Sequence, residues 1–230
     1  MDKECVSENT FFLPNKDEIK KNYDSFVPVF SGILNNIEQE LSDKISLKSK
    51  PTFKSRIKSF ESYYKKLLRV KKPELLAESK TVLCLTDMLG IRIICAFLED
   101  LSAVENQLKS LYEITEIEHK GNQNNFKEFG YESVHVLIKI PKSCIPDAVS
   151  PSDLPSDLVC EIQIRTILQD AWAEVEHELV YKSEFSPFDM PLRRKLASMN
   201  ATLSLADIIF QEIRDYQNKL QVEMDERRQS

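Results

Sequence analysis

Three short segments in which apolar and polar residues alternate place the strongest limit on how this chain can fold. The segment 132–140 puts Val134, Val136 and Ile138 on one face, and segments 90–97 and 158–165 follow the same pattern. Alternation with a period of two is typical of strands that bury one face. The opposite face of these strands then carries polar side chains, namely Arg92, Ser133, His135, Glu161, Gln163 and Arg165.

Segments with helical periodicity lie between and beside these strands. We expect helices over residues 15–44, 59–70, 99–112, 166–182 and after 190, and further extended segments near Phe53 and Arg56 and over 113–119. Strands and helices that alternate around one sheet predict an α/β (α+β) fold. Its core should be a mixed β-sheet of about five strands flanked by helices.

Three of the helices carry more specific predictions. Pro28 should bend or interrupt helix 15–44, because proline removes a backbone hydrogen bond. Helix 59–70 should turn Tyr63, Tyr64, Leu67 and Leu68 toward the core. In helix 166–182 the apolar stripe should be buried and the polar side chains should lie opposite; the stripe is Leu168, Ala171, Trp172, Val175 and Leu179, and the polar set is Asp170, Glu174, His177 and Tyr181.

Composition excludes several classes of protein. Only 4 residues are Gly, which argues against a Gly-rich phosphate loop, so side chains would have to hold any nucleotide. The 5 cysteines include no C-x-x-C pair, so neither a disulfide framework nor a zinc site is indicated. No apolar run is long enough to span a bilayer or to form a signal peptide, and we therefore expect one compact, cytoplasmic protein with no membrane partner.

Charge is distributed unevenly along the chain. The formal net charge is -6, which disfavours general polyanion binding and therefore a DNA partner. Lysine and arginine nevertheless dominate between Lys48 and Lys72, where Glu61 is the only acid. This segment is either a polyphosphate-binding surface or a solvated basic helix, and charge alone leaves both interpretations open.

Polar residues of one chemical theme come from several separate segments. Cations occur at Arg56, Lys58, Lys66 and Arg92, acids at Asp87 and Glu161, and an aromatic ring at Tyr131. Taken singly, each has a structural explanation. Together they are the set needed for metal-assisted transfer of a phosphate-derived group.

Four blocks of sequence resemble the synthetase domain of RelA/SpoT proteins. They are Arg56-Ile-Lys58-Ser-Phe-Glu-Ser62-Tyr-Tyr-Lys-Lys66, Asp87-Met-Leu-Gly90-Ile-Arg92, Gly130-Tyr131-Glu-Ser133-Val-His135, and Glu161-Ile-Gln163-Ile-Arg165-Thr166 continuing to Trp172-Ala-Glu-Val-Glu176-His177. One block alone would be a weak signal. All four in order imply a nucleotidyltransferase-like synthetase core over residues 51–185, with an N-terminal helical element over 1–50 and C-terminal helices over 186–230.

On this resemblance, one group of residues binds ATP and the metal. Arg56, Lys58, Ser62 and Lys66 correspond to residues that grip the triphosphate, and Arg92 to the guanidinium that stacks on adenine. Asp87 resembles the Mg²⁺ ligand. Glu161 resembles the catalytic glutamate that accepts the proton of the attacking 3′-hydroxyl and also touches the metal. A strand-end salt bridge is the alternative for Arg92.

A second group resembles the acceptor site. Tyr131 corresponds to the ring that stacks on guanine, and the neighbours of the acceptor would be Lys127, His135, Gln163, Asp170 and His177. A buried structural histidine is the alternative for His135, and a solvated face is the alternative for Glu174 and Tyr181.

The resemblance implies a (p)ppGpp synthetase, a GTP pyrophosphokinase that moves the β,γ-pyrophosphate of ATP to the 3′-hydroxyl of GDP or GTP in the stringent response. No histidine is followed by aspartate, so the hydrolase half of long family members is not expected. Small members commonly assemble into tetramers through terminal helices. On this resemblance we expect a homo-oligomer that forms through the residues after Met190, with a tetramer as one form.

Two rival functions remain open on the sequence. The same fold could modify adenine nucleotides or the 3′ end of tRNA as a toxin, or the chain could be an inactive nucleotide-binding or RNA-binding regulator. The pair Asp87 and Glu161 argues against the regulator, because binding alone does not need two repelling acids. Glu132 stands where several small members carry a cation, and the choice between GDP and GTP is therefore also open.

Overall fold

A five-stranded mixed sheet forms the centre of the computed structural model, which describes residues 16–69, 84–120, 133–181 and 190–229. The strand order is β1-β2-β5-β4-β3. β2 and β5 are parallel and the other neighbours are antiparallel, which confirms the predicted mixed sheet. The strands are β1 (Thr52–Ile57), β2 (Leu89–Cys95), β3 (Ile114–Lys120), β4 (Ser133–Lys139) and β5 (Val159–Thr166).

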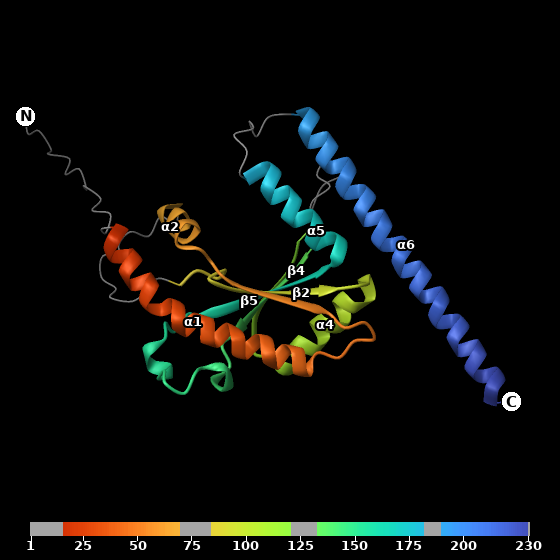
Figure 1. Cartoon of the computed structure of the whole chain (residues 1–230), viewed down its shortest axis with the longest axis horizontal. Coiled ribbons are helices and arrows are strands. Elements are labelled where there is room, and N and C mark those ends of the chain that lie inside the picture. The colour runs from red at the N-terminus through yellow and green to blue at the C-terminus, as the bar shows by residue number, and fades with distance from the viewer. Residues whose placement is uncertain (1–15, 70–83, 121–132, 182–189, 230) are drawn as a thin grey trace, which may run out of the picture.

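Helices lie on both sides of this sheet (Figure 1). The long helices are α1 (Lys16–Lys44), α2 (Phe60–Arg69), α4 (Leu98–Leu111), α5 (Ile167–Glu176) and α6 (Met190–Gln229). α5 continues into a π-helical turn, His177–Tyr181, and the connection before β5 holds the short 3₁₀ turns Lys142–Cys144 and Pro151–Asp153. α1 and α4 cover one face of the sheet, while α5 lies over the other.

The covered apolar face is the hydrophobic core. Side chains of the three central strands, among them Ile91, Val136 and Ile162, are fully buried there. They pack against apolar side chains of α1 and α4, which are Phe30, Ile33, Ile37, Leu41, Val104 and Leu108. The alternation seen in the sequence therefore marks the core face correctly.

α1 runs without a break through Pro28, so the predicted interruption is wrong, while the bend predicted as the other possibility stays a prediction. Tyr23 and Phe30 are buried on either side of the proline, whereas Pro28 itself is exposed. Burial of a large aromatic side chain stabilises by about 1.5–3 kcal/mol, which offsets much of the roughly 3 kcal/mol that an interior proline costs. Core packing thus outweighs the local preference.

α2 begins beside Ser59, whose hydroxyl accepts a hydrogen bond from the Ser62 backbone N–H at 3.4 Å. A serine in this place satisfies one of the free N–H groups at a helix start. Tyr63 and Leu67 are buried as predicted, but Leu68 is 49% exposed, because a ten-residue helix of this kind turns only a narrow stripe inward.

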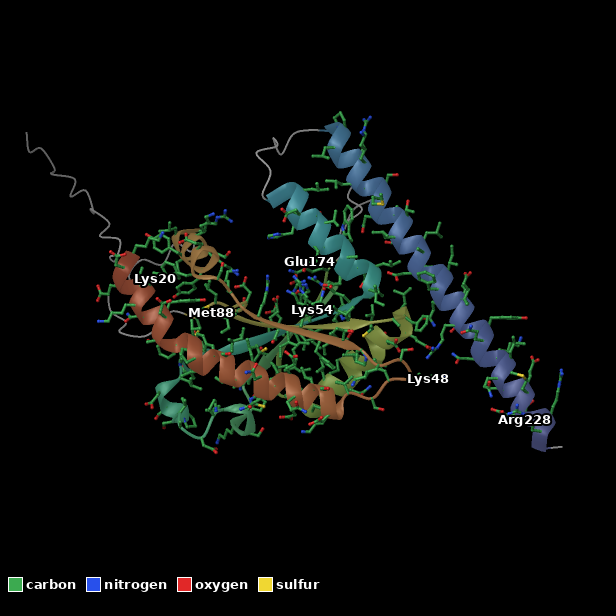
Figure 2. All side chains as sticks on the ribbon, viewed as in Figure 1. Lys20, Lys48, Lys54, Met88, Glu174 and Arg228 are labelled. Carbon is green, nitrogen blue, oxygen red and sulfur yellow. The ribbon has the colours of Figure 1, made fainter. Side chains whose placement is uncertain are left out.

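α5 is oriented differently from the sequence prediction. Asp170 is only 5% exposed, whereas Val175 is 51% exposed, and Ala171 and Leu179 are also exposed. Trp172 is buried, as predicted. α5 takes this orientation because cations on the polar face of the sheet attract its carboxylates. Figure 2 shows Lys54 of the sheet and Glu174 of α5 on these facing elements.

Several polar side chains of α6 contact the body of the protein. Thr166 donates a buried hydrogen bond to Asp207 at 2.7 Å, and the Arg214 guanidinium lies 4.6 Å from the centre of the Phe97 ring. Gln211 accepts from the Glu99 backbone N–H at 3.0 Å. These α6 residues recur at helical spacing, so they define the side of α6 that faces the body.

Candidate functional site

Pairing of the five strands arranges the polar side chains in two rows across one face of the sheet. The first row is Arg56, Gly90, Glu161, Leu137 and Glu116, and the second is Lys54, Arg92, Gln163, His135 and Glu118. Directly paired residues point to the same face of a sheet. Residues up to 116 positions apart in sequence therefore meet here, as Lys54 and Asp170 do.

A cleft of about 330 Å³ opens over these rows. Six residues predicted from sequence line it, namely Arg56, Lys66, Asp87, His135, Glu161 and Gln163. They come from β1, α2, β4, β5 and the segment just before β2. The structure thus brings both predicted acids and two of the four predicted cations, Arg56 and Lys66, into one cleft, while their individual roles stay predictions.

Glu161 is held from two sides. His135 Nδ1 lies 2.8 Å from Glu161 Oε1, and the Gln163 amide donates to Oε2 at 2.7 Å. Burial raises the pKa of Glu161, but the hydrogen bond and charge of His135, with smaller contributions from Gln163 and Lys120, outweigh it and bring the pKa below its ordinary value. Glu161 is therefore an ionised and oriented carboxylate at neutral pH.

Asp87 is held by two lysines. Lys58 Nζ lies 2.6 Å from Oδ2 and Lys66 Nζ lies 3.0 Å from Oδ1. Burial raises the pKa of Asp87, yet its two lysine partners lower the pKa below its ordinary value. The cleft thus contains a second ionised carboxylate, next to cations that could exchange it for a phosphate.

These two carboxylates suit a hard divalent cation. Oδ1 of Asp87 is buried and has no well-oriented hydrogen bond within the described residues. In that part of the chain no cluster of three or more His, Cys, Asp or Glu side chains could hold a metal by itself. Mg²⁺ commonly takes only one or two carboxylates and completes its octahedron with phosphate oxygens and water. Asp87 and Glu161 therefore fit a metal that arrives with a nucleotide.

Arg92 lies beside the cleft in a network of charges under α5. Its guanidinium contacts Glu174, and it lies 3.2 Å from Asp170. Asp170 also lies 2.7 Å from Lys54 and 3.6 Å from Arg165. Two carboxylates thus orient the Arg92 guanidinium, which was predicted to stack on adenine. The salt bridge that was the alternative for Arg92 is present in this arrangement.

Asp170, predicted to face the acceptor, lies in this network and not among the described residues lining the cleft. His177 is exposed in the turn after α5, and Ser62 is exposed on α2, where its hydroxyl contacts Ser59 at 3.0 Å. Neither lines the cleft. Lys127, Tyr131 and Glu132 lie outside the described residues.

Five residues of this face were not assigned a role from sequence. Lys54 and Arg165 join the network around Asp170, and Glu116, Glu118 and Lys120 line the cleft. The signal for Arg165 was its place two residues after Gln163 on the same strand face. The sequence indicated a role for Glu116, Glu118 and Lys120 less clearly, because alternation on an edge strand does not reveal what its polar side faces.

Fold and cleft together define an α+β protein whose sheet presents acids and cations suited to phosphorylated ligands. The chain belongs to the RelA/SpoT family, because residues 55–186 match the region found in RelA / SpoT proteins.

Two curated relatives support this membership. The chain is 37% identical over 129 residues to GTP pyrophosphokinase YwaC and 32% identical over 117 residues to GTP pyrophosphokinase YjbM, both of Bacillus subtilis (strain 168). These matches cover 56% and 50% of this chain, and 57% and 52% of the relatives. The chain thus spans about half the length of the curated relatives it matches.

Solved structures share the fold over most of the chain. Small alarmone synthetase 1 from Bacillus subtilis, bound to its product pppGpp, aligns with a TM-score of 0.68 at 21% identity and covers 86% of this chain and 99% of that one. Small alarmone synthetase 2 of the same organism aligns with a TM-score of 0.62 at 25% identity, over 86% and 98%. None of the helices described in the present chain has the length and apolar character to span a bilayer.

Proposed function

We propose that this protein is a (p)ppGpp synthetase, a GTP pyrophosphokinase that transfers the β,γ-pyrophosphate of ATP to the 3′-hydroxyl of GDP or GTP in the stringent response. The observation that carries the proposal is the presence of two ionised carboxylates, Asp87 and Glu161, in one cleft with the cations Arg56 and Lys66. The names of the relatives YwaC and YjbM support the same activity.

Glu161 is the proposed general base. Its carboxylate accepts the proton of the 3′-hydroxyl, and the 3′-oxygen attacks the β-phosphorus of ATP. The bond between the β-phosphorus and the α,β-bridging oxygen breaks, and AMP leaves with that electron pair. His135 and Gln163 fix the carboxylate beforehand, so little reorganisation is needed during the reaction.

Arg56, Lys58 and Lys66 are the proposed triphosphate ligands. Lys58 and Lys66 contact Asp87, and the phosphate oxygens of bound ATP would replace that carboxylate as their partners. Asp87 and Glu161 are the proposed ligands of Mg²⁺, which when bound would neutralise charge that develops on the phosphates. Arg92, oriented by Asp170 and Glu174, offers its guanidinium plane to adenine.

An assay of label transfer tests this proposal. Purified protein is mixed with Mg²⁺, ATP labelled at the γ-phosphate and, in turn, GDP, GTP, ADP or deacylated tRNA. We expect label on a guanine nucleotide with one AMP released per transfer. Label on ADP or tRNA alone would replace the proposed acceptor with that of the toxin alternative, and transfer to no acceptor would favour a protein that only binds nucleotides.

A homo-oligomer formed through α6 completes the proposal, with a tetramer as one form. Large apolar side chains recur along α6 on the side away from the polar residues that contact the body; they include Ile209, Ile213, Tyr216 and Leu220, exposed by 38% to 63%. A stripe of this spacing is typical of a helix that packs on another helix. A second copy of the chain presents the same stripe, and a two-fold interface is self-complementary.

Sedimentation measures this assembly. We expect Ile213→Glu to shift the protein toward the monomer, because a charge would be buried in the apolar stripe. Lys219→Glu, also on α6 but outside the stripe, introduces the same side chain and should leave the assembly unchanged. A wild-type protein that sediments as a monomer at micromolar concentration would contradict the proposed assembly.

A further inference from the structure

Two carboxylates of edge strand β3 face the candidate site. Glu116 lies opposite Leu137, which neighbours Glu161, and Glu118 lies opposite His135. Both line the cleft, together with Lys120 of the same strand. They project from the side of the cleft opposite α2 and β1, which carry Lys66 and Arg56.

This end of the cleft also holds polar atoms that have no partner in the described part of the chain. Nε2 of His135 and Oε1 of Gln163 are buried and make no hydrogen bond there. The two residues are 7% and 6% exposed, and both line the cleft. Buried polar groups normally find partners, so these two atoms indicate contacts made by a bound ligand.

The charge of the β3 side is unusual for a site that takes nucleotides. Among the described lining residues, the cations Arg56, Lys66 and Lys120 face the carboxylates Asp87, Glu116, Glu118 and Glu161. Lys120 is the only lysine or arginine from β3 or β4 among the described lining residues, and its Nζ lies 3.6 Å from Glu118 Oε2. The imidazole of His135 on β4 is already paired with Glu161 at 2.8 Å. Glu116 makes no ion pair with any residue that the structure describes. The acids therefore exceed the cations on this side.

We infer that Glu116 and Glu118 limit the number of phosphates on the acceptor, so that the enzyme favours GDP over GTP. The inference rests on the proposed function. Donor phosphates would be met by Lys58, Lys66 and Arg56 on the other side of the cleft, which leaves the β3 side to the acceptor. An added phosphate there would approach Glu116 and Glu118, and Lys120 is already partly neutralised by Glu118.

Coulomb repulsion sets the size of the expected effect. One unit charge about 8 Å from an added phosphate, in a partly solvated cleft, changes binding by roughly threefold to fivefold, and salt weakens the effect. Glu118→Gln removes one charge and releases Lys120 from its partner, and Glu116→Gln removes another. The double variant should therefore raise the GTP-to-GDP ratio of kcat/KM about tenfold.

The experiment compares kcat/KM for GDP and for GTP in the wild type, both single variants and the double variant, at fixed saturating ATP. We expect the wild type to favour GDP, the double variant to lose that preference, and KM for ATP to stay unchanged. Glu113→Gln is the matched control, because Glu113 pairs with Lys139 just before β3 and does not line the cleft. The GTP-to-GDP ratio of kcat/KM for Glu113→Gln should equal that of the wild type.

Two results would overturn the inference. They are a wild type that favours GTP, and a double variant that is active with an unchanged ratio. A wild type that transfers pyrophosphate to neither nucleotide would instead refute the proposed function. In that case calorimetric dissociation constants for GDP and GTP still test the inference, and equal GTP-to-GDP ratios in the wild type and the double variant would reject it.

Discussion

Replacing Glu161 with glutamine should lower the rate of pyrophosphate transfer by roughly 10² to 10³ or more, the range expected when a general base or a preorganised charge is removed. Glutamine keeps the shape of the side chain but cannot take the proton of the 3′-hydroxyl. Its amide also carries no charge for His135, which lies 2.8 Å from the present carboxylate. Single-turnover rates at saturating ATP and GDP measure the loss.

Binding measurements separate a catalytic loss from a structural one. We expect the Glu161→Gln variant to unfold at nearly the wild-type denaturant concentration, because Gln163 can still donate to the side-chain oxygen that replaces Oε2. Glu113→Gln removes the same charge outside the cleft and should keep full activity. A Glu161→Gln rate within tenfold of the wild type would exclude this residue as the base.

Much of the sheet could be predicted from the sequence, because alternation is a local signal. Ile91, Val136 and Ile162 each sit in a run with a period of two, and all three lie in the core. The same alternation placed Arg92, His135 and Glu161 on the opposite face. The order of the strands could not be predicted in this way, because the pairing of Gly90 with Glu161 joins segments that are far apart in the chain.

The orientation of α5 could not be predicted for a physical reason. An amphipathic pattern indicates which side of a helix is apolar, and the usual inference buries that side. Here the facing sheet surface is polar and rich in cations, so Asp170 is buried against it, the exposed Glu174 contacts Arg92, and Val175 turns outward. Only the tertiary arrangement of Lys54, Arg92 and Arg165 decides this choice. Acceptor contacts inferred for Asp170 from the resemblance stay a prediction.

Removal of the Asp170 carboxylate should destabilise the fold more than any surface substitution. The Asp170 carboxylate forms ion pairs with Lys54, Arg92 and Arg165. Burial, followed by the charge of Arg92, lowers the pKa of Arg165 to about 10, and Asp170 is the group that counters this shift. Breaking a buried ion pair by removing one partner costs about 3–5 kcal/mol. We expect Asp170→Ala to lose about 3 kcal/mol in the free energy of unfolding, measured by urea denaturation.

Two comparisons show whether this cost comes from uncompensated charge. Asp147→Ala removes an exposed acid with no ion pair in the described structure, and should change stability by no more than about 0.5 kcal/mol. The double variant Asp170→Leu with Arg165→Met replaces the buried pair by apolar side chains, and should be clearly less destabilised than the sum of its single variants. Additive losses would mean that packing, and not charge, holds α5 on the sheet. A loss below about 1 kcal/mol for Asp170→Ala would contradict the prediction, because it would mean that the buried guanidinium of Arg165 does not depend on this carboxylate.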